Sequence, residues 1–429
     1  MSPAENVQTP ASCSDEHDGE NVYSTPWPHR FIGWSKTGTH PDDEYHRLIG
    51  RGEQVFINGY PLRQVLSRDK LTRGTFFADL DGQRLYVQAS HNARLDQNAE
   101  RVEASVRSTV WDVKGDHVHT RGITFRYGAT QAQQGLVRLQ GRGDAVEDCV
   151  FESANSEGAD FRGPDQVARR CVFQDNGQDG FTAGGAHRLL MTECATRNNN
   201  TKNFNRDWGG GGNKIVLSRG GVIEKSQFLA NRGNGIWLHI GNEDCTVRHC
   251  LIADNEGAGI FYETSFGLHA HDNVIVGKGL LSGPGAWGAN GAIAWSSSPR
   301  CVSERNLMRG NKEDFQFREQ RRTTPRIDGQ EGSPEEWVWN HDQIIRSNLL
   351  AYNRDTQVWG WFAADDDPHW PRALQRPGAA NPQRPQNDTA ADYQAERKDG
   401  APTALALEKL NLTFEGNLYA VLPGQGSFG

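Results

Sequence analysis

Short apolar strand segments recur at a nearly fixed spacing through the middle of the chain. In each repeat a small or polar anchor residue closes one segment, and the residue nine positions later opens the next. The pairs are Cys149 with Gly158, Cys171 with Gly180, Ser226 with Gly235, Cys250 with Gly259, and more loosely Asn306 with Phe315 and Asn348 with Gln357. With Cys194 and Asn273 included, successive anchors are 22–24 residues apart, and insertions lengthen three of the intervals.

Strand-rich repeats of this length predict a solenoid, because each repeat can bury its apolar face only against its neighbours. We therefore expect an all-β protein, a right-handed parallel β-helix of about ten coils. The anchors should form one column that points into the helix, since stacked Asn side chains hydrogen-bond to one another and small thiols pack closely.

The chain divides into three predicted parts. Residues 1–20 predict a disordered tail. Residues 21–104 predict a β-rich module that caps the helix, with Asp81-Gly82 as a hairpin turn. Residues 105–429 predict the β-helix itself, interrupted at about 365–401 by a long loop rich in Pro, Asp and Gln. The segment LTFEGNLYA then returns to the repeat, with Asn417 in the anchor column.

The strand segments after the glycines predict an outward strip of aromatic and charged side chains. Alternate residues of a strand face opposite ways, and the first and third positions are mostly apolar, so they should point inward. The outward positions are then Lys214, Trp237, His239, Phe261, Glu263, Trp295, Phe317, Glu319, Trp359 and Trp361. An exposed aromatic strip favours a saccharide-binding surface, with Trp237, Phe261, Trp295, Lys214 and Trp208 as its binding residues. The alternative is that insertions cover the strip and its rings form a second core.

Carboxylates on or beside this strip are candidates for acid–base catalysis. Glu263 and Glu319 fall in one column two coils apart, roughly 9–10 Å between backbones in a regular stack. That separation permits either an inverting or a retaining glycosidase once side-chain reach is included. Aromatic neighbours would raise the pKa of Glu263, as a general acid requires. His239, Asp207 and Glu243 are further candidates, because they lie in or beside the same column.

Composition and charge narrow the choice of partner. The net charge is −8 without a basic stripe, which argues against nucleic acid, and no run approaches the ~18 apolar residues of a membrane span. The N-terminus has neither a basic start nor an apolar run. The chain as it stands therefore predicts a cytoplasmic protein, or a periplasmic or secreted one if a leader was removed.

The pattern of cysteine and histidine residues offers little support for disulfide bonds or a metal site. Seven cysteines occur without a CxxC pair, which favours buried reduced thiols. His269 and His271 share a face in LHAHDN, but a third ligand is not evident, so we predict neither a metal site nor a cofactor.

The segments GNGIWLHIGNED and GAGIFYETSFG resemble paired motifs of β-helix carbohydrate-active proteins, most closely the glycoside hydrolases of the β-xylosidase type. The resemblance implies that Glu263 is the acid/base residue, and that His239 stands where those enzymes carry a nucleophilic Asp. It implies a glycoside hydrolase acting on a plant or algal saccharide. Two alternatives remain: a lyase of the same fold that uses His239 and Lys214 on a uronate, and a non-catalytic saccharide-binding or assembly protein with an eroded site.

Overall fold

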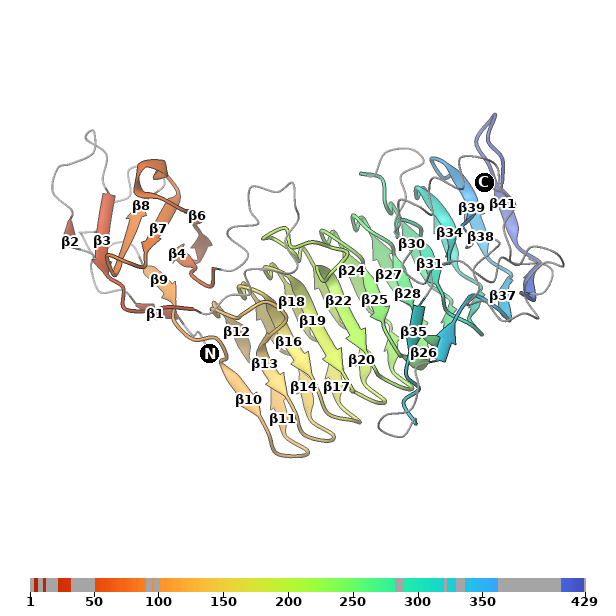
Figure 1. Cartoon of the computed structure of the whole chain (residues 1–429), viewed down its shortest axis with the longest axis horizontal. Helices are drawn as coiled ribbons and strands as arrows, with labels where there is room; N and C mark the ends of the chain where they lie inside the picture. The colour runs from red at the N-terminus through yellow and green to blue at the C-terminus, as the bar shows by residue number, and fades with distance from the viewer. Residues whose placement is uncertain are drawn as a thin grey trace, which may run out of the picture.

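The computed structural model describes residues 4–6, 11–12, 22–31, 51–89, 95, 101–281, 289–319, 322–328, 336–361 and 410–427. Within these residues the chain winds through three long parallel sheets that form the walls of a helix (Figure 1). Each sheet contains ten strands, so the right-handed parallel β-helix of about ten coils predicted from the sequence is confirmed.

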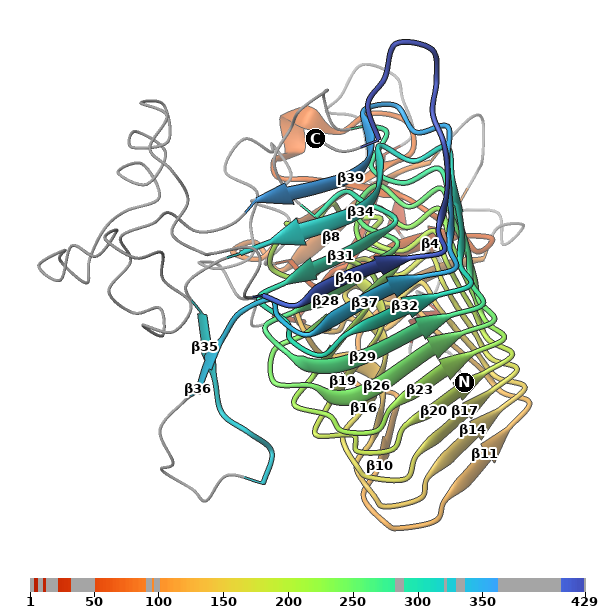
Figure 2. The same ribbon diagram turned by 90° about the vertical axis from the view of Figure 1, so that its right-hand side faces the viewer.

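The three sheets take one strand each from every coil, as Figure 2 shows from the C-terminal end of the helix. The first sheet consists of β10 (Trp111–Val113), β13 (Gly135–Leu139), β16 (Glu157–Phe161), β19 (Asp179–Gly184), β22 (Gly211–Val216), β25 (Ile236–His239), β28 (Ile260–Glu263), β31 (Ile293–Ser296), β34 (Glu313–Arg318) and β39 (Thr356–Trp361). The second consists of β11 (His119–Arg121), β14 (Ala145–Glu147), β17 (Val167–Arg169), β20 (Leu190–Thr192), β23 (Val222–Glu224), β26 (Glu243–Arg248), β29 (Phe266–His271), β32 (Val302–Glu304), β37 (Gln343–Arg346) and β40 (Leu412–Glu415). The third consists of β12 (Thr124–Arg126), β15 (Val150–Glu152), β18 (Val172–Gln174), β21 (Ala195–Arg197), β24 (Gln227–Leu229), β27 (Leu251–Ala253), β30 (Val274–Val276), β33 (Leu307–Arg309), β38 (Leu349–Ala351) and β41 (Leu418–Ala420).

The anchor residues form the inward column that their spacing predicts. The backbone N–H of Cys194 donates to Ser226 Oγ at 3.1 Å, and that of Cys250 donates to Asn273 Oδ1 at 3.0 Å. The column continues to the last coil, where Asn348 Nδ2 donates to Asn417 Oδ1 at 3.1 Å. The six cysteines within the described residues are buried free thiols.

A second asparagine ladder runs parallel to the anchors, five positions later in each repeat. Its side-chain amides bond in series, with Asn176 Nδ2 donating to Asn199, Asn199 to Asn231, and Asn231 to Asn255, at 2.8–3.0 Å. Each amide also donates to a backbone carbonyl, so the polar groups of these buried corners are satisfied. The sequence carries the signal, since Asn recurs five residues after Cys171, Cys194, Ser226 and Cys250.

The N-terminal module consists of two small sheets with their own apolar core. One contains β1 (Ala4–Asn6), β9 (Val102–Ser105), β4 (Val55–Ile57) and β5 (Tyr60–Pro61). The other contains β2 (Ala11–Ser12), β3 (Val22–Pro26), β8 (Arg84–Gln88), β7 (Thr75–Asp79) and β6 (Arg63–Val65), and a 3-10 turn, η1, spans Arg68–Lys70. The predicted turn at Asp81-Gly82 joins β7 to β8, which are antiparallel. The module lies at the N-terminal end of the helix (Figure 1).

Two of the predicted segments, residues 1–20 and the loop at about 365–401, have different outcomes. Strands β1 and β2 lie within residues 1–20, for which the sequence predicts disorder. The long loop predicted at 365–401 lies outside the described residues. In the described part of the chain, no helix has the length and apolar character needed to cross a membrane.

Candidate functional site

The candidate site lies on the outward face of the first sheet, over β22, β25 and β28. Ile236 and Leu238 of β25 point into the main core, so Trp237 and His239 face outward. The register pairs Trp237 with Phe261 and His239 with Glu263. The two motifs therefore place the imidazole directly beside the carboxyl group on neighbouring coils.

The two outward rings are covered, not exposed as the sequence predicts. Trp237 and Phe261 stack with their centroids 5.5 Å apart, and only 2% and 4% of their surfaces are exposed. Lys214 Nζ lies 4.3 Å from the Trp237 ring centroid, and the Arg318 guanidinium lies 5.4 Å from that of Phe261. With Ala258 and Ala294 the rings form a small second core, so the alternative of a covered strip holds at this point.

Glu263 is the central carboxyl group of the site. It is only 6% exposed, and burial raises the pKa of its side chain. Trp237 Nε1 donates to Oε2 at 3.2 Å, and Arg322 Nη1 donates to Oε1 at 3.3 Å. These donors and the nearby cations favour the charged form, but desolvation is the larger effect. The group is therefore poised to hold a proton at a higher pH than an ordinary glutamate.

His239 is held as a neutral imidazole. Burial, with the positive charges of Lys214 and Arg322, lowers the pKa of His239 to about 3. Arg322 Nη2 lies 3.1 Å from Nε2, which therefore accepts, and Glu263 Oε2 lies 3.6 Å from the same nitrogen. Because the imidazole is uncharged near neutral pH, it cannot act as a counter-ion for Glu263.

Trp295 and Glu319 do not lie in the predicted columns, and both placements are wrong by one residue. Trp295 pairs with Tyr262, not with Phe261, and packs in the main core 4.5 Å from the Phe315 ring. The cause is that Ala292, not Gly291, takes the place of Gly259 in that coil. Phe315 likewise pairs with Ile293, so Phe317 also points inward.

The corrected register puts Arg318 two coils from Glu263. The column runs from Glu263 through Ser296 to Arg318. Glu319 instead accepts from Ser297 Oγ at 2.8 Å and from the backbone N–H of Asn340 at 2.7 Å, in a fully buried position. Glu319 thus connects the coil to the end of an insertion. The predicted column of two carboxylates is instead a column with the carboxyl group of Glu263 and the guanidinium group of Arg318.

Glu243 has a structural position at the start of β26. Arg219 Nε, Arg326 Nε and the backbone N–H of Ile327 each donate to its carboxylate at 2.9 Å. Burial alone would raise the pKa of Glu243, but these donors lower it to about 2. Glu243 thereby fixes the segment 322–328, which begins with β35 (Arg322–Thr324) and pairs with β36 (Glu336–Val338) outside the coils (Figure 2).

Asp207, Trp208 and Lys214 lie at the rim. The segment between β21 and β22 passes over the sheet, and Lys214 Nζ donates to the backbone carbonyl of Trp208. Asp207 is exposed, and its charge acts on Arg318. Burial lowers the pKa of Lys214, with Asp179 and Glu263 as opposing charges.

Sequence reasoning missed several charged residues around the site. The predicted register is wrong by one residue in this coil and therefore places Arg318 at an inward position. Arg322 belongs to an insertion that no repeat predicts. On the N-terminal side the same face carries three acidic residues with raised pKa values because of burial, Glu157, Asp160 and Asp179. Thr182 Oγ1 lies 2.7 Å from Glu157 and 3.2 Å from Asp160. Their positions relative to Gly158 and Gly180 could have identified them.

The histidine cluster predicted in LHAHDN pairs with carboxylates. His269 Nε2 lies 3.1 Å from Glu304 Oε1, and His271 Nδ1 lies 2.6 Å from Asp272 Oδ2. Among the described residues, no group of three or more His, Cys, Asp or Glu side chains is arranged to hold a metal ion.

Comparison with known proteins supports the architecture. A family model described as "Right handed beta helix region" matches residues 134–308, and no curated protein matches the chain. A solved structure of XylC with xylose superposes on the whole chain and on 74% of its own, with a TM-score of 0.64 at 12% identity. A glycoside hydrolase structure covers 66% of this chain and 57% of its own, with a TM-score of 0.40 at 12% identity. The A-module of the Azotobacter vinelandii mannuronan C-5 epimerase AlgE4 covers 75% and 79%, with a TM-score of 0.40 at 11% identity. At these identities the likeness concerns the fold, and the chain is a right-handed parallel β-helix protein.

Proposed function

We propose that the protein acts on a saccharide at the outward face of the first sheet, with Glu263 as the proton donor in cleavage of a glycosidic bond. The supporting observation is the state of this one side chain. It is buried and has a raised pKa, yet it lies beside the partly exposed Arg322 at the edge of the site. A general acid needs a proton at working pH and access to the leaving oxygen.

Neighbouring residues would orient and tune this acid. Trp237 Nε1 fixes one carboxyl oxygen, which leaves the other to face the substrate together with Arg322. Since the faces of Trp237 and Phe261 are covered, we assign substrate contact to the rim residues Lys214, Trp208 and Arg322. The structure of XylC in complex with xylose has a similar fold and is consistent with a saccharide ligand here.

Hydrolysis also needs a second carboxylate, and His239 occupies the position of the Asp in the enzymes that the motifs resemble. Glu319 and Glu243 are engaged in buried contacts, which makes them poor substitutes. Asp207 is exposed at the rim and interacts electrostatically with Arg318. We therefore assign the second carboxylate to Asp207.

The test is release of reducing ends from a panel of neutral oligosaccharides by wild type and by Glu263→Gln. The substitution keeps the shape and removes the proton, so the rate should fall by roughly 100- to 10,000-fold with binding largely kept. The matched control is Glu193→Gln, which changes an exposed glutamate directly after β20 of the second sheet. This variant should keep full activity. Full activity of Glu263→Gln would refute the assignment.

A second candidate is elimination from a uronate saccharide. It is favoured by the three cations that act on Glu263, namely Lys214, Arg318 and Arg322. Arginines can neutralise the uronate carboxylate, and an amine with a lowered pKa can take the adjacent C–H proton while Glu263 protonates the leaving oxygen. An unsaturated product that absorbs in the ultraviolet would identify this reaction, whereas hydrolysis produces none.

A further inference from the structure

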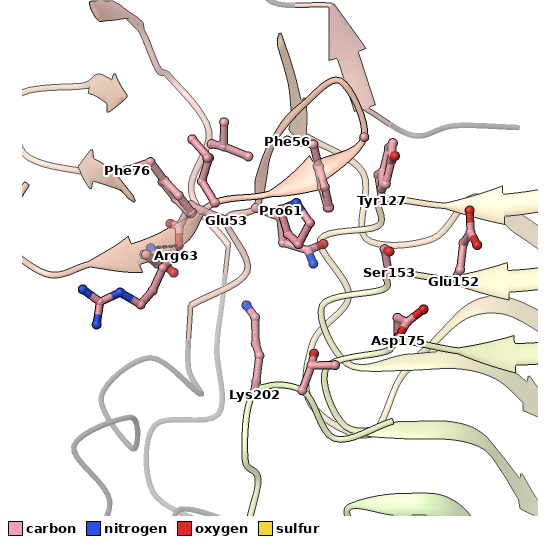
Figure 3. A pocket seen from close by; sticks show the side chains of 16 residues that line it. Glu53, Phe56, Pro61, Arg63, Phe76, Tyr127, Glu152, Ser153, Asp175 and Lys202 are labelled. Carbon is pink, nitrogen blue, oxygen red and sulfur yellow. Dashed lines mark hydrogen bonds between the residues drawn. The ribbon is translucent and has the colours of Figure 1, made fainter. Parts of the chain in front are cut away.

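A cavity of about 620 Å³ lies where the N-terminal module meets the helix. We call it the junction cavity. Its walls come from β4 to β6 of the module and from the turns that follow β15, β18 and β21 of the helix (Figure 3). Its volume falls within the ~300–1,000 Å³ of typical small-molecule sites, which often occur between domains. Glu263, on β28, is not among its lining residues.

One side of the junction cavity is aromatic and apolar. Phe56 of the module and Tyr127 of the helix stack with their centroids 3.9 Å apart, and Pro61 and Leu62 extend this surface. Arg126 lies over the Tyr127 ring, 4.7 Å from its centroid. This contact joins the two parts of the chain. Since Phe56 and Tyr127 are only 1% and 3% exposed, the apolar surface open to a ligand comes from Pro61 and Leu62.

The other side carries hydrogen-bonding groups of both kinds. Glu152, Ser153 and Asp175 line the cavity on the helix side, where Figure 3 labels them. Lys202 rises between the two parts, donates to Asn155 Oδ1, and lies 3.5 Å from the carbonyl oxygen of Arg51. The wall thus combines acceptors and donors within one cavity.

One polar atom on the module side of the cavity has no hydrogen-bond partner among the described residues. Gln64 Nε2 donates to Glu53 Oε2 at 3.1 Å, but Gln64 Oε1 is shut off from solvent and has no hydrogen-bond partner among the described residues. A buried acceptor of this kind is costly unless something donates to it. This oxygen lies behind the surface of the cavity, so it is a cost within the wall and not a contact open to a ligand.

The charges of the junction cavity are mixed. Glu53, Glu152 and Asp175 are opposed by Arg63 and Lys202. Burial raises the pKa of Asp175, and burial lowers the pKa of Lys202 to about 8 against the attraction of Glu53. Acidic and basic side chains are nearly balanced in this lining, so the cavity presents no large excess of either sign to a strongly charged ligand.

We infer that the junction cavity is a second binding site, and that it takes an uncharged polyhydroxylated ligand of one or two sugar rings. Hydroxyl groups both donate and accept, which matches a wall of carboxylates, an amide and an amine. The apolar face of the ring would lie on Pro61 and Leu62. This inference does not depend on catalysis at Glu263.

The experiment is calorimetric titration of the full chain with D-xylose, D-glucose and their β-1,4-linked disaccharides. D-glucuronate and inorganic phosphate serve as charged comparators. All titrations are repeated on Glu263→Gln, so that binding at the junction is measured apart from turnover. We expect saturable binding of a neutral sugar that is the same in wild type and in Glu263→Gln.

Two substitutions locate the binding. Thr201→Trp fills the junction cavity from an exposed position and should abolish it. Asp175→Asn keeps the backbone conformation, whose φ is 54°, and should raise Kd roughly tenfold. Asp148→Asn, at an equivalent φ of 53° away from the cavity, is the control and should change nothing. The inference is overturned if wild type binds no neutral sugar, if Thr201→Trp binds normally at an unchanged Tm, or if a charged comparator binds more tightly.

Discussion

The guanidinium group of Arg322 reaches the carboxyl group of Glu263 from 59 residues further along the chain, with Nη1 3.3 Å from Oε1. The same group places Nη2 3.1 Å from His239 Nε2. Arg322, which belongs to an insertion, thus contacts both Glu263 and His239, which the repeat places on neighbouring coils. Because nearby positive charges favour the ionised carboxylate, Arg318 and Arg322 together limit how far burial raises the pKa of Glu263.

We predict that Arg322→Met raises the pKa of Glu263 further. A protonated Glu263 would then persist to higher pH, so the alkaline limb of the kcat/KM profile should move up by about one pH unit. The pH dependence of activity measures this, and NMR titration of labelled glutamate measures it without substrate. Arg309→Met, on the third sheet, is the control. An unchanged or lowered alkaline limb would show that Arg322 does not act on Glu263.

Glu243 should control whether Arg322 reaches the site. We expect Glu243→Gln to loosen segment 322–328, because the carboxylate accepts from Arg326 Nε and from the N–H of Ile327. Hydrogen bonds to a charged group contribute ~1.5–3 kcal/mol, so amide exchange at Ile327 should accelerate by roughly 10- to 100-fold. Asp328→Asn removes only an exposed partner of Arg219 and should have little effect.

The pH dependence of this contact follows from the lowered pKa of Glu243. Its native pKa is about 2, against 4.5 for an ordinary glutamate. The stabilisation is therefore complete above about pH 4.5 and is lost as the pH falls toward 2. Protection of Ile327 in wild type should decline over that range, and protection that survives below pH 2 would contradict the role given to Glu243.

The sequence was sufficient for the fold and for part of the site. Anchor spacing predicts the coils because each coil must place the same residue on the same corner, and the motifs place Glu263 beside His239 correctly. The error at Trp295 arises because Ala292, not Gly291, aligns with Gly259. The error at Glu319 arises because the spacing of nine from Asn306 leads to Phe315, which aligns with Ile293 and not with a glycine position. The burial of Trp237 and the role of Glu243 depend on side chains from insertions, whose contacts no periodicity encodes.

Asp179 should destabilise the protein at high pH. Burial raises the pKa of Asp179 from 3.8 to about 7, and neither of its carboxyl oxygens has a hydrogen-bond partner among the described residues. The unfolded chain releases the proton near pH 4, so stability is highest below that pH and falls as the pH rises toward 7. Asp179→Asn removes this cost and should raise the free energy of unfolding at pH 8 by on the order of 1–3 kcal/mol.

The measurement is thermal unfolding of the Asp179→Asn variant and wild type at pH 5 and pH 8. The gain in Tm should be larger at pH 8. Asp165→Asn is the control with the opposite sign, because Arg188 lowers the pKa of that exposed carboxylate. A gain that is larger at pH 5 would mean that Asp179 is stabilised as a carboxylate by contacts other than those described.

The absence of a carboxylate at position 239 leads to the last prediction. His239→Asp would place an anion where Arg322 Nη2 now meets the imidazole, so a hydrogen-bond donor is already available to it. The new charge beside Glu263 would also raise the pKa of that acid, which favours its protonated form. We therefore expect His239→Asp to release reducing ends faster than wild type, by at least about tenfold if the carboxylate acts as nucleophile or base. His239→Asn has nearly the same shape without the charge and is the matched control. If the Asp and Asn variants are equally active, the imidazole has not replaced a catalytic carboxylate, and Asp207 remains the residue to substitute next.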